Sequence, residues 1–311
     1  EAAIVGQGGC AAAMRSQQEW AVHPQGLAVA DEPLLHVALT VAAPKPAWAN
    51  RININRPLEG IRVLDLTRVL AGPVATRFLA GYGADVLRID SPTWDEPGVV
   101  PEVTLGKRLA RVDLRQAEGR ATLEALLRQA DVLVHGYRPE ALARLGFDAQ
   151  TRRRLNPGLV DVCLDAYGWS GPWRGRRGFD SLVQMSSGIA DAGMHRWNRD
   201  RPTPLPVQAL DHATGYIMAA AVVRGLVMRL QTGAGSEIRT SLARTAALLT
   251  SQSVQFPQKD FQVESIDDLA DPIELTSWGS ARRLKAPVSI EGVPMQWTLP
   301  AGLLGSSPAV W

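Results

Sequence analysis

The chain has 311 residues, of which 46% are hydrophobic and 21% are charged, and its formal net charge is +2. This composition is typical of a globular protein with a substantial core, and the length allows one large domain or two ordinary ones. The small net charge does not indicate nucleic-acid binding, no apolar run reaches the roughly 18 residues that a membrane span needs, and no signal-peptide pattern is present. We therefore expect a cytoplasmic enzyme or binding protein whose partners include neither nucleic acid nor a membrane.

The cysteine and arginine residues indicate which bonds and ligands to expect. Cys10 and Cys163 lie far apart, and Cys163 stands inside an apolar run typical of a strand, so we expect two buried thiols rather than a disulfide or a metal pair. No metal-ligand spacing is evident, and we expect no metal. Arginine is abundant and lysine scarce, which favours local recognition of phosphate or carboxylate by planar guanidinium groups. The chain opens on Glu1 within a helical pattern and without an initiator Met, so we expect it to be part of a longer polypeptide.

The first fifty residues contain short elements and no obvious chemistry. Residues 15–20 have the capping-box pattern of a helix start, and residues 23–26 read as a turn. A strand is expected at 34–41, followed by a proline-containing linker at 43–50.

From Ile61 onward, strands and helices alternate. Near-continuous apolar runs predict buried strands at 61–66, 85–89, 131–135 and 159–164. Between them, helical patterns end near residue 83 and cover 118–129, 140–145 and 149–155. This alternation predicts an α/β fold with a parallel sheet and right-handed crossovers.

The second half of the chain is mainly helical. Helices are expected at 179–190, 210–230 and 242–253, with strand-like stretches at 112–114 and 237–240. From Pro257 onward the sequence is polar and weakly periodic, and we expect it to wrap over another surface.

Ligands in such sheets gather beyond the carboxyl ends of the strands. Each of those ends carries a small residue or turn with an arginine or an aromatic residue nearby, in the segments 68–73, 89–92, 136–139 and 166–168. Backbone N–H groups, arginine side chains and a tyrosine face suit a nucleotide with phosphates. The usual dinucleotide and P-loop patterns are absent, and each loop taken singly also fits plain turn chemistry.

Other basic residues and turns allow both a binding and a structural interpretation. The group Lys107, Arg108, Arg111 and Arg115 fits a solvated edge as well as a phosphate contact. Arg144 could close on the same ligand as the 136–139 turn, and Arg177 is the candidate in the cluster at 174–177. The turns at 168–173 and 186–188 could let a ligand approach the backbone or be simple turns.

Asp211 ends an apolar run, and a helix of small residues follows it at once. Pro204 and Pro206 hold the approach extended, so Asp211 falls at or near a helix N-terminus, where an anion is favoured. An N-cap role would explain this position without any chemistry. His212 is adjacent, but successive helical residues point in different directions, so we expect no direct dyad.

Several motifs together resemble the family III CoA-transferases, which include formyl-CoA and carnitine CoA-transferases and α-methylacyl-CoA racemase. The resemblance covers about residues 56–250 in order, and the matching segments are 56–73, 83–89, 106–115, 130–139, 144–146, 167–172, 178–180 and 211–215.

This resemblance implies a Rossmann-like large domain, an interlocked homodimer, and acyl-CoA and carboxylic acid as substrates. It implies that Asp211 is the nucleophile, which attacks an acyl-CoA thioester and passes through an aspartyl-CoA thioester. It also implies coenzyme A contacts at Leu70, Ala71, Val112, Asp113, Leu114, Arg115, Gly136, Tyr137, Arg138, Arg144, Arg177 and Asp180.

Some positions depart from the family pattern. Ser91 and Asp165 stand where transferases can carry an arginine and a lysine, which affects the phosphate contacts. Phe179 replaces the proton-transferring histidine of the racemase branch, so we favour a transferase. An acyl-CoA isomerase and a non-catalytic CoA-binding subunit remain as alternatives.

The family usually has a small domain after the helical segment and a glycine-rich loop, and neither is recognisable here. Residues 15–26 instead resemble the end of such a small domain. We therefore expect a remnant of it with a linker at 1–55, the large domain at 56–256 and a wrapping segment at 257–311.

Overall fold

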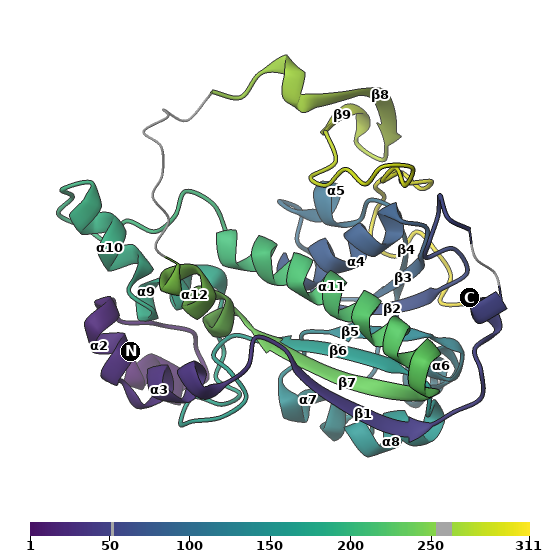
Figure 1. Ribbon diagram of the computed structural model, residues 1–311, viewed down its shortest axis with the longest axis horizontal. Coiled ribbons are helices and arrows are strands. Elements are labelled where there is room, and N and C mark those ends of the chain that lie inside the picture. The colour runs from purple at the N-terminus through teal and green to yellow at the C-terminus, as the bar shows by residue number, and fades with distance from the viewer. Residues whose placement is uncertain (51–52, 253–262) are drawn as a thin grey trace.

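A seven-stranded mixed sheet forms the centre of the molecule (Figure 1). The computed structural model describes residues 1–50, 53–252 and 263–311. The strand order is β1-β7-β6-β5-β2-β3-β4, and of these strands β1 alone pairs antiparallel. The strands are β1 His36–Ala42, β2 Arg62–Leu66, β3 Asp85–Asp90, β4 Lys107–Arg111, β5 Val132–His135, β6 Val160–Asp165 and β7 Ala234–Ser241. The predicted α/β, Rossmann-like fold with flanking helices is confirmed.

Helices cover both faces of the sheet. One face carries α4 (Ala71–Gly81) and the long α11 (Ala209–Thr232), which pack against each other. The other face carries α6 (Ala117–Gln129), α7 (Pro139–Arg144) and α8 (Ala149–Leu155) (Figure 1). Successive strand residues point to opposite faces, so each strand contributes to two cores.

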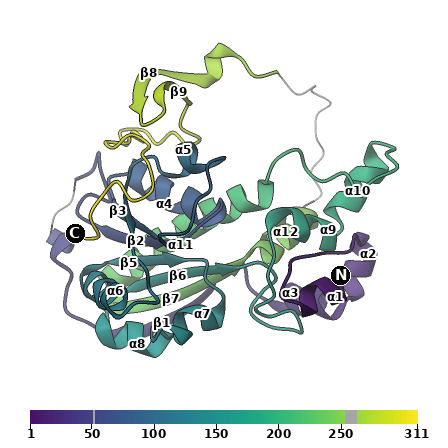
Figure 2. The same ribbon diagram turned by 180° about the vertical axis from the view of Figure 1, so that it is seen from behind.

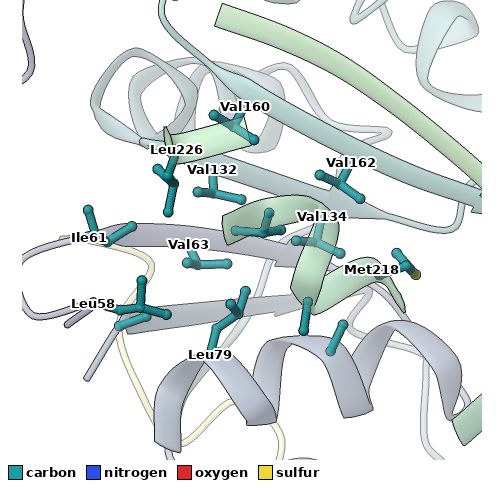
Figure 3. Close-up of a cluster of buried hydrophobic side chains, with 14 of the residues drawn as sticks. Leu58, Ile61, Val63, Leu79, Val132, Val134, Val160, Val162, Met218 and Leu226 are labelled. Carbon is teal, nitrogen blue, oxygen red and sulfur yellow. The ribbon is translucent and has the colours of Figure 1, made fainter. Parts of the chain in front are cut away.

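In β2 and β5, successive side chains alternate between the two faces of the sheet. Val63, Val132 and Val134 pack beneath α4 and α11 (Figure 3), whereas Leu64 and Leu133 pack on the side of α6. All five side chains are fully buried. A continuous apolar run is therefore what a strand covered on both faces requires.

The prediction of a strand at 112–114 is wrong by a few residues. The strand is β4, which ends at Arg111 opposite Asp90, the last residue of β3. Beyond that point β4 has no partner strand left, so Val112 and its successors continue as a loop. Their backbone contributes one more hydrogen bond, from the Val112 N–H to the Asp90 carbonyl at 2.9 Å.

The N-terminal stretch packs against the same sheet domain. The predicted capping box is confirmed at Ser16 and Glu19, which start α2 (Gln17–Val22) after the short α1 (Ala2–Gly6). The turn expected at 23–26 is wrong, because His23 caps a third helix, α3 (Pro24–Asp31), whose first residue is a proline. Trp20 and Val29 share a buried cluster with residues of α9 and α12.

The helix expected at 179–190 is interrupted. It forms α9 (Asp180–Ser186) and α10 (Ile189–Arg196), because Gly188 between them has a left-handed conformation with φ of 85°. The remaining elements are α5 Val100–Val103, α12 Leu242–Ser251, β8 Leu269–Thr276, β9 Gly279–Leu284 and the 3-10 turns η1 Ala47–Asn50 and η2 Ile266–Asp268.

The C-terminal segment runs along the β4 side of the sheet (Figure 2). After the β8–β9 hairpin, the Ser307 N–H donates to the Leu109 carbonyl in β4 at 2.8 Å. The Trp311 indole then donates to the Leu126 carbonyl in α6 at 3.1 Å. The surface that this segment covers is therefore on its own chain.

The expectation that no segment is long and apolar enough to span a membrane is wrong for α11. This helix of 24 residues contains an 18-residue window with a mean hydropathy of 1.3. Its Met218, Ala219 and Val222 are buried in the core against the sheet and α4, so its apolar character is that of a central core helix.

Candidate functional site

A cavity of about 520 Å³ lies at the carboxyl ends of the strands. The loop after β2, the Gly136–Arg138 turn after β5 and the end of β6 line it, and so do Asp211 and the 175–179 loop. This is the edge of the sheet where ligands of open α/β folds bind, and the volume is in the range of small-molecule sites.

A second cavity of about 210 Å³ adjoins the first and shares Arg68 and Tyr137 with it. Of this adjoining pair, the cavity of about 520 Å³ is named the larger cavity and the other the smaller cavity. The carboxyl end of β3 and Ser91 directly after it line this smaller cavity together with the segment Val112–Arg115. Tyr137, in the 136–138 loop, thus lines the same cavity as the 112–115 loop. The family resemblance predicts that both loops contact one ligand.

Asp211 lies in the first turn of α11, and its side chain lines the larger cavity while only 6% of the residue is exposed. The N-cap interpretation is wrong: the helix begins after Gln208, and no side chain caps it. Asp211 is the third helical residue, so its carboxylate is close to the helix N-terminus without being used to cap it.

The pKa of Asp211 is raised from its usual value to about 7, by burial and then by the negative charge of Asp180. The Asp180 carboxylate accepts the backbone N–H of Asp211 at 2.9 Å and the Gln184 amide at 2.5 Å. Asp180 is buried and does not line the cavity. Its carboxylate oxygens thus hold the Asp211 backbone and the Gln184 side chain.

Asp165, at the end of β6, also lines the larger cavity. One of its carboxylate oxygens accepts the Gly168 N–H at 2.7 Å, and the other has no hydrogen-bond partner among the described residues. Burial raises its pKa to about 8. At pH 7 Asp165 is therefore mostly protonated, whereas Asp211 is near the midpoint between its acid and carboxylate forms.

Arginines therefore dominate the charge of the larger cavity, which Arg68, Arg138, Arg176 and Arg177 line. The Arg176 side chain is 9% exposed, and its guanidinium pairs with the Glu1 carboxylate at 2.6 Å and lies 3.9 Å from the centre of the Trp173 ring. Arg68, Arg138 and Arg177 add further positive charge to the cavity, which favours an anionic ligand such as a phosphate or a carboxylate.

The 175–179 loop approaches the end of β6 closely. A Cβ atom at Gly178 would lie 2.7 Å from side-chain atoms of both Ala166 and Tyr167. Only glycine fits there, and the close approach brings Arg176 and Arg177 to the cavity.

The N-terminal segment also reaches the site. Cys10 lines the larger cavity and is only partly buried, so the expectation of two buried thiols is wrong for Cys10 and confirmed for Cys163. The Arg177 guanidinium donates to the Gly8 carbonyl at 2.7 Å. A third cavity of about 750 Å³ lies between this segment and the arginines, and it shares Arg138, Arg176 and Arg177 with the first.

The predicted site residues fall into three groups. Those that line the larger cavity are Leu70, Ala71, Gly136, Tyr137, Arg138, Arg177 and Asp211. Those that line the smaller one are Val112, Asp113, Leu114 and Arg115, with Tyr137 shared. Arg144 and Asp180 line neither. Arg144 is on the exposed side of α7 and pairs with Glu140 at 3.0 Å, so a ligand contact would require this ion pair to open.

Arg68 is a candidate that the family resemblance does not assign. It lines both cavities, stacks on Trp94 at 4.5 Å, and its Nε is buried without a partner among the described residues. Its position directly after β2 is the sequence signal. Arg176 had a weaker signal, since nothing in the sequence distinguishes it from Arg177.

Among the described residues, no histidine lines the cavity beside Asp211. Phe179 lines the cavity, and His212 is absent from the described residues that line it. The pKa of His212 is lowered by burial and then by the charge of Arg77, on another side of the helix. The site thus combines a buried carboxyl group with several arginine side chains.

The fold and the cavity together define an α/β protein with an anion-favouring crevice at the carboxyl ends of its strands and a buried carboxyl group within it. Residues 58–271 match CoA-transferase family III, and the chain belongs to that family.

Relatives of known name support this assignment. A succinate–glutarate CoA-transferase of Agrobacterium fabrum is 31% identical over 224 residues, which are 66% of this chain and 56% of that protein. A probable fatty acyl-CoA transferase of Mycobacterium tuberculosis is 31% identical over 216 residues, which are 65% of this chain and 54% of that protein. The chain spans about half the length of the curated relatives it matches.

Solved structures agree. A CAIB/BAIF family protein from Brucella suis has a TM-score of 0.57 at 27% identity, over 73% of this chain and 65% of that chain. The Mycobacterium tuberculosis protein has a TM-score of 0.56 at 29% identity, over 64% of this chain and 59% of that chain.

Proposed function

We propose that the chain provides the nucleophile and the coenzyme A site of an acyl-CoA:carboxylate CoA-transferase. The observation that carries this proposal is the placement of Asp211: a buried carboxyl group that lines a crevice otherwise dominated by arginines. The names of the relatives as CoA-transferases support the same reaction class.

The adjoining cavities suggest how acyl-CoA lies. We place its adenosine diphosphate part along the smaller cavity, where Arg68 and Arg115 can meet phosphate and Tyr137 offers a ring face. The pantetheine part then passes the Leu70–Ala71 loop toward Asp211 in the larger cavity.

The proposed reaction has four steps: two transfer CoA from the donor acid to Asp211, and two transfer it from Asp211 to the acceptor acid. The Asp211 carboxylate oxygen attacks the thioester carbonyl carbon, and the C–S bond breaks. CoA departs as the thiolate, and a mixed anhydride of the donor acid and Asp211 remains. The thiolate attacks the aspartyl carbonyl carbon, which releases the donor carboxylate and leaves an aspartyl-CoA thioester.

The acceptor carboxylate displaces CoA thiolate from this thioester to form a second anhydride. The thiolate then attacks the acceptor acyl carbon and regenerates the Asp211 carboxylate. The backbone N–H groups at the start of α11 are placed to stabilise developing negative charge.

Trapping the aspartyl thioester tests this proposal. Borohydride added to the protein with acyl-CoA should reduce the Asp211 thioester to the alcohol, so the peptide containing residue 211 should carry homoserine in place of aspartate. Asp211→Asn should abolish CoA transfer by at least about a thousandfold while CoA still binds, because the amide keeps the shape but loses the nucleophile.

Other outcomes would identify a different function. Deuterium exchange into acyl-CoA without CoA transfer would indicate an isomerase. CoA binding with neither reaction would indicate a non-catalytic subunit. The homodimer that the family resemblance implies stays a prediction.

A further inference from the structure

Val69 has an unusual backbone conformation in the loop between β2 and α4. Its φ is +65°, in the left-handed region, and among the described residues only Asn198 shares this feature outside glycine. Asparagine tolerates the region, whereas for a β-branched residue it is strained. Val69 lines the larger cavity and directly precedes Leu70, the N-cap residue of α4.

Glu96 holds this strained residue. One of its carboxylate oxygens accepts the Val69 N–H at 2.9 Å, and the other accepts a hydrogen bond from the Arg88 guanidinium. Arg88 is fully buried and also pairs with Asp90 at 2.8 and 3.1 Å. The acceptor for the Val69 N–H is therefore itself fixed, with only 9% of the Glu96 side chain exposed.

The preceding part of the loop is anchored separately. The Thr67 N–H and hydroxyl donate to one Asp65 oxygen at 2.9 and 2.5 Å, and the other oxygen pairs with the buried Lys107 ammonium at 2.9 Å. A Cβ atom at Gly72 would lie 2.3 Å from the Thr67 side chain, so the start of α4 is pressed against this anchor. The backbone at Val69 must therefore turn between Thr67, which Asp65 holds, and the start of α4, which is packed against Thr67.

We propose that Glu96 is a positioning residue for acyl-CoA binding: its carboxylate holds Val69 in the left-handed conformation and so presents Leu70 and Ala71 to the pantetheine part of the ligand. Glu96 lines neither cavity that we assign to acyl-CoA, so it acts through the loop and not by contact. Strain of this kind persists only where the surroundings enforce it. The proposal rests on the proposed function for the identity of the ligand.

A double-variant experiment isolates the backbone effect. CoA affinity is measured by calorimetry for the wild type, Glu96→Ala, Val69→Gly and the combination of both. Glu96→Ala should weaken CoA binding about tenfold, because Val69 relaxes out of the left-handed region. Val69→Gly alone should change affinity less than about threefold. The combination should regain most of the loss, because glycine adopts positive φ without strain.

Two variants serve as controls. Glu96→Gln keeps an oxygen for the Val69 N–H and should stay within about threefold of the wild type. Glu102→Ala removes another ion-paired glutamate, in α5, which pairs with Arg283 and with Arg77 in the body of α4. Among the described residues Glu102 forms no hydrogen bond to the loop between β2 and α4, so this variant should leave CoA affinity unchanged.

The outcomes separate this inference from the proposed function. Absence of CoA binding by the wild type would overturn the proposed function. Binding by the wild type with equal binding by Glu96→Ala would overturn the role of Glu96. A loss in Glu96→Ala that Val69→Gly does not recover would also overturn it, since Glu96 would then act by charge or by fold stability.

Discussion

Three buried aspartates at the carboxyl edge of the sheet show how neighbours decide the pKa of one residue type. Burial raises the pKa of each, but at Asp65 the charges of Lys107 and Arg88 outweigh burial and lower it. Among the described residues no cation pairs with Asp211 or Asp165, and their pKa values rise to about 7 and about 8. The lowered pKa favours the charged form of Asp65 in the core, while Asp211 can exchange its charge near neutral pH.

This difference predicts the pH dependence of the proposed activity. The nucleophile must be the carboxylate, and a group with a raised pKa loses its charge as the pH falls through that value, so kcat/KM should decline below a pH of about 7. Asp180→Asn removes the like charge but keeps an oxygen for the Asp211 N–H, so the decline should shift to lower pH.

A pH profile of kcat/KM for both proteins checks this prediction. Asp200→Asn, at an exposed position, serves as the control and should leave the profile unchanged. An Asp180→Asn profile that superimposes on the wild-type profile would show that Asp180 does not influence the charge of Asp211.

At the scale of elements, the contact between α4 and α11 brings the loop before α4 to the carboxylate on α11. Gly215 lies one turn after Asp211 and faces α4, where an added Cβ would lie 2.6 Å from the Ala71 carbonyl oxygen and 2.8 Å from the Val74 Cβ. The helices can approach this closely because glycine has no side chain.

Gly215→Ala should push the two helices apart. We expect a loss of about 1–3 kcal/mol in the free energy of unfolding from overpacking, together with weaker CoA binding, because Ala71 and Asp211 line one cavity. Urea denaturation and calorimetry measure the two effects. Gly98→Ala is the matched control, since nothing lies within 4 Å of a Cβ there; equal stability of the two variants would contradict the close packing.

At the scale of the whole molecule, the last residues protect an edge of the sheet. β4 is the final strand in the order, so its outer backbone groups would otherwise be free to pair with another chain. The Ser307 hydroxyl accepts the Leu109 N–H at 3.1 Å, and Trp311 is flanked by the guanidinium groups of Arg62 and Arg108 at 5.7 and 5.5 Å.

Trp311→Ala should therefore loosen the tail and lower the free energy of unfolding by about 1–3 kcal/mol, less than for a fully buried tryptophan. Hydrogen exchange should show reduced protection of the Leu109 amide. Val310→Ala, at a side chain that is 55% exposed, should change neither quantity. Unchanged exchange in Trp311→Ala would mean that the tail is held without its tryptophan.

Local pattern was sufficient for most of the elements and for the position of Asp211 near a helix start. The apolar runs at 61–66 and 131–135 predict buried strands because both faces of such strands are covered, and the structure has β2 and β5 there. Asp211 could be placed near a helix start because it follows a rigid proline-containing approach and precedes a small-residue helix, whereas its selection as the candidate nucleophile came from the family resemblance. These properties depend on residues near one another in the sequence.

The tertiary structure alone decided which side chains meet. The sequence gives no register for β4, which is set by the length of β3, and it gives no reason to join Asp180 to the Asp211 backbone across 31 positions. It also does not indicate that Arg144 faces solvent or that Glu96 holds Val69. Such contacts depend on strand order and helix packing, and these are set by the burial of the whole core rather than by any single segment.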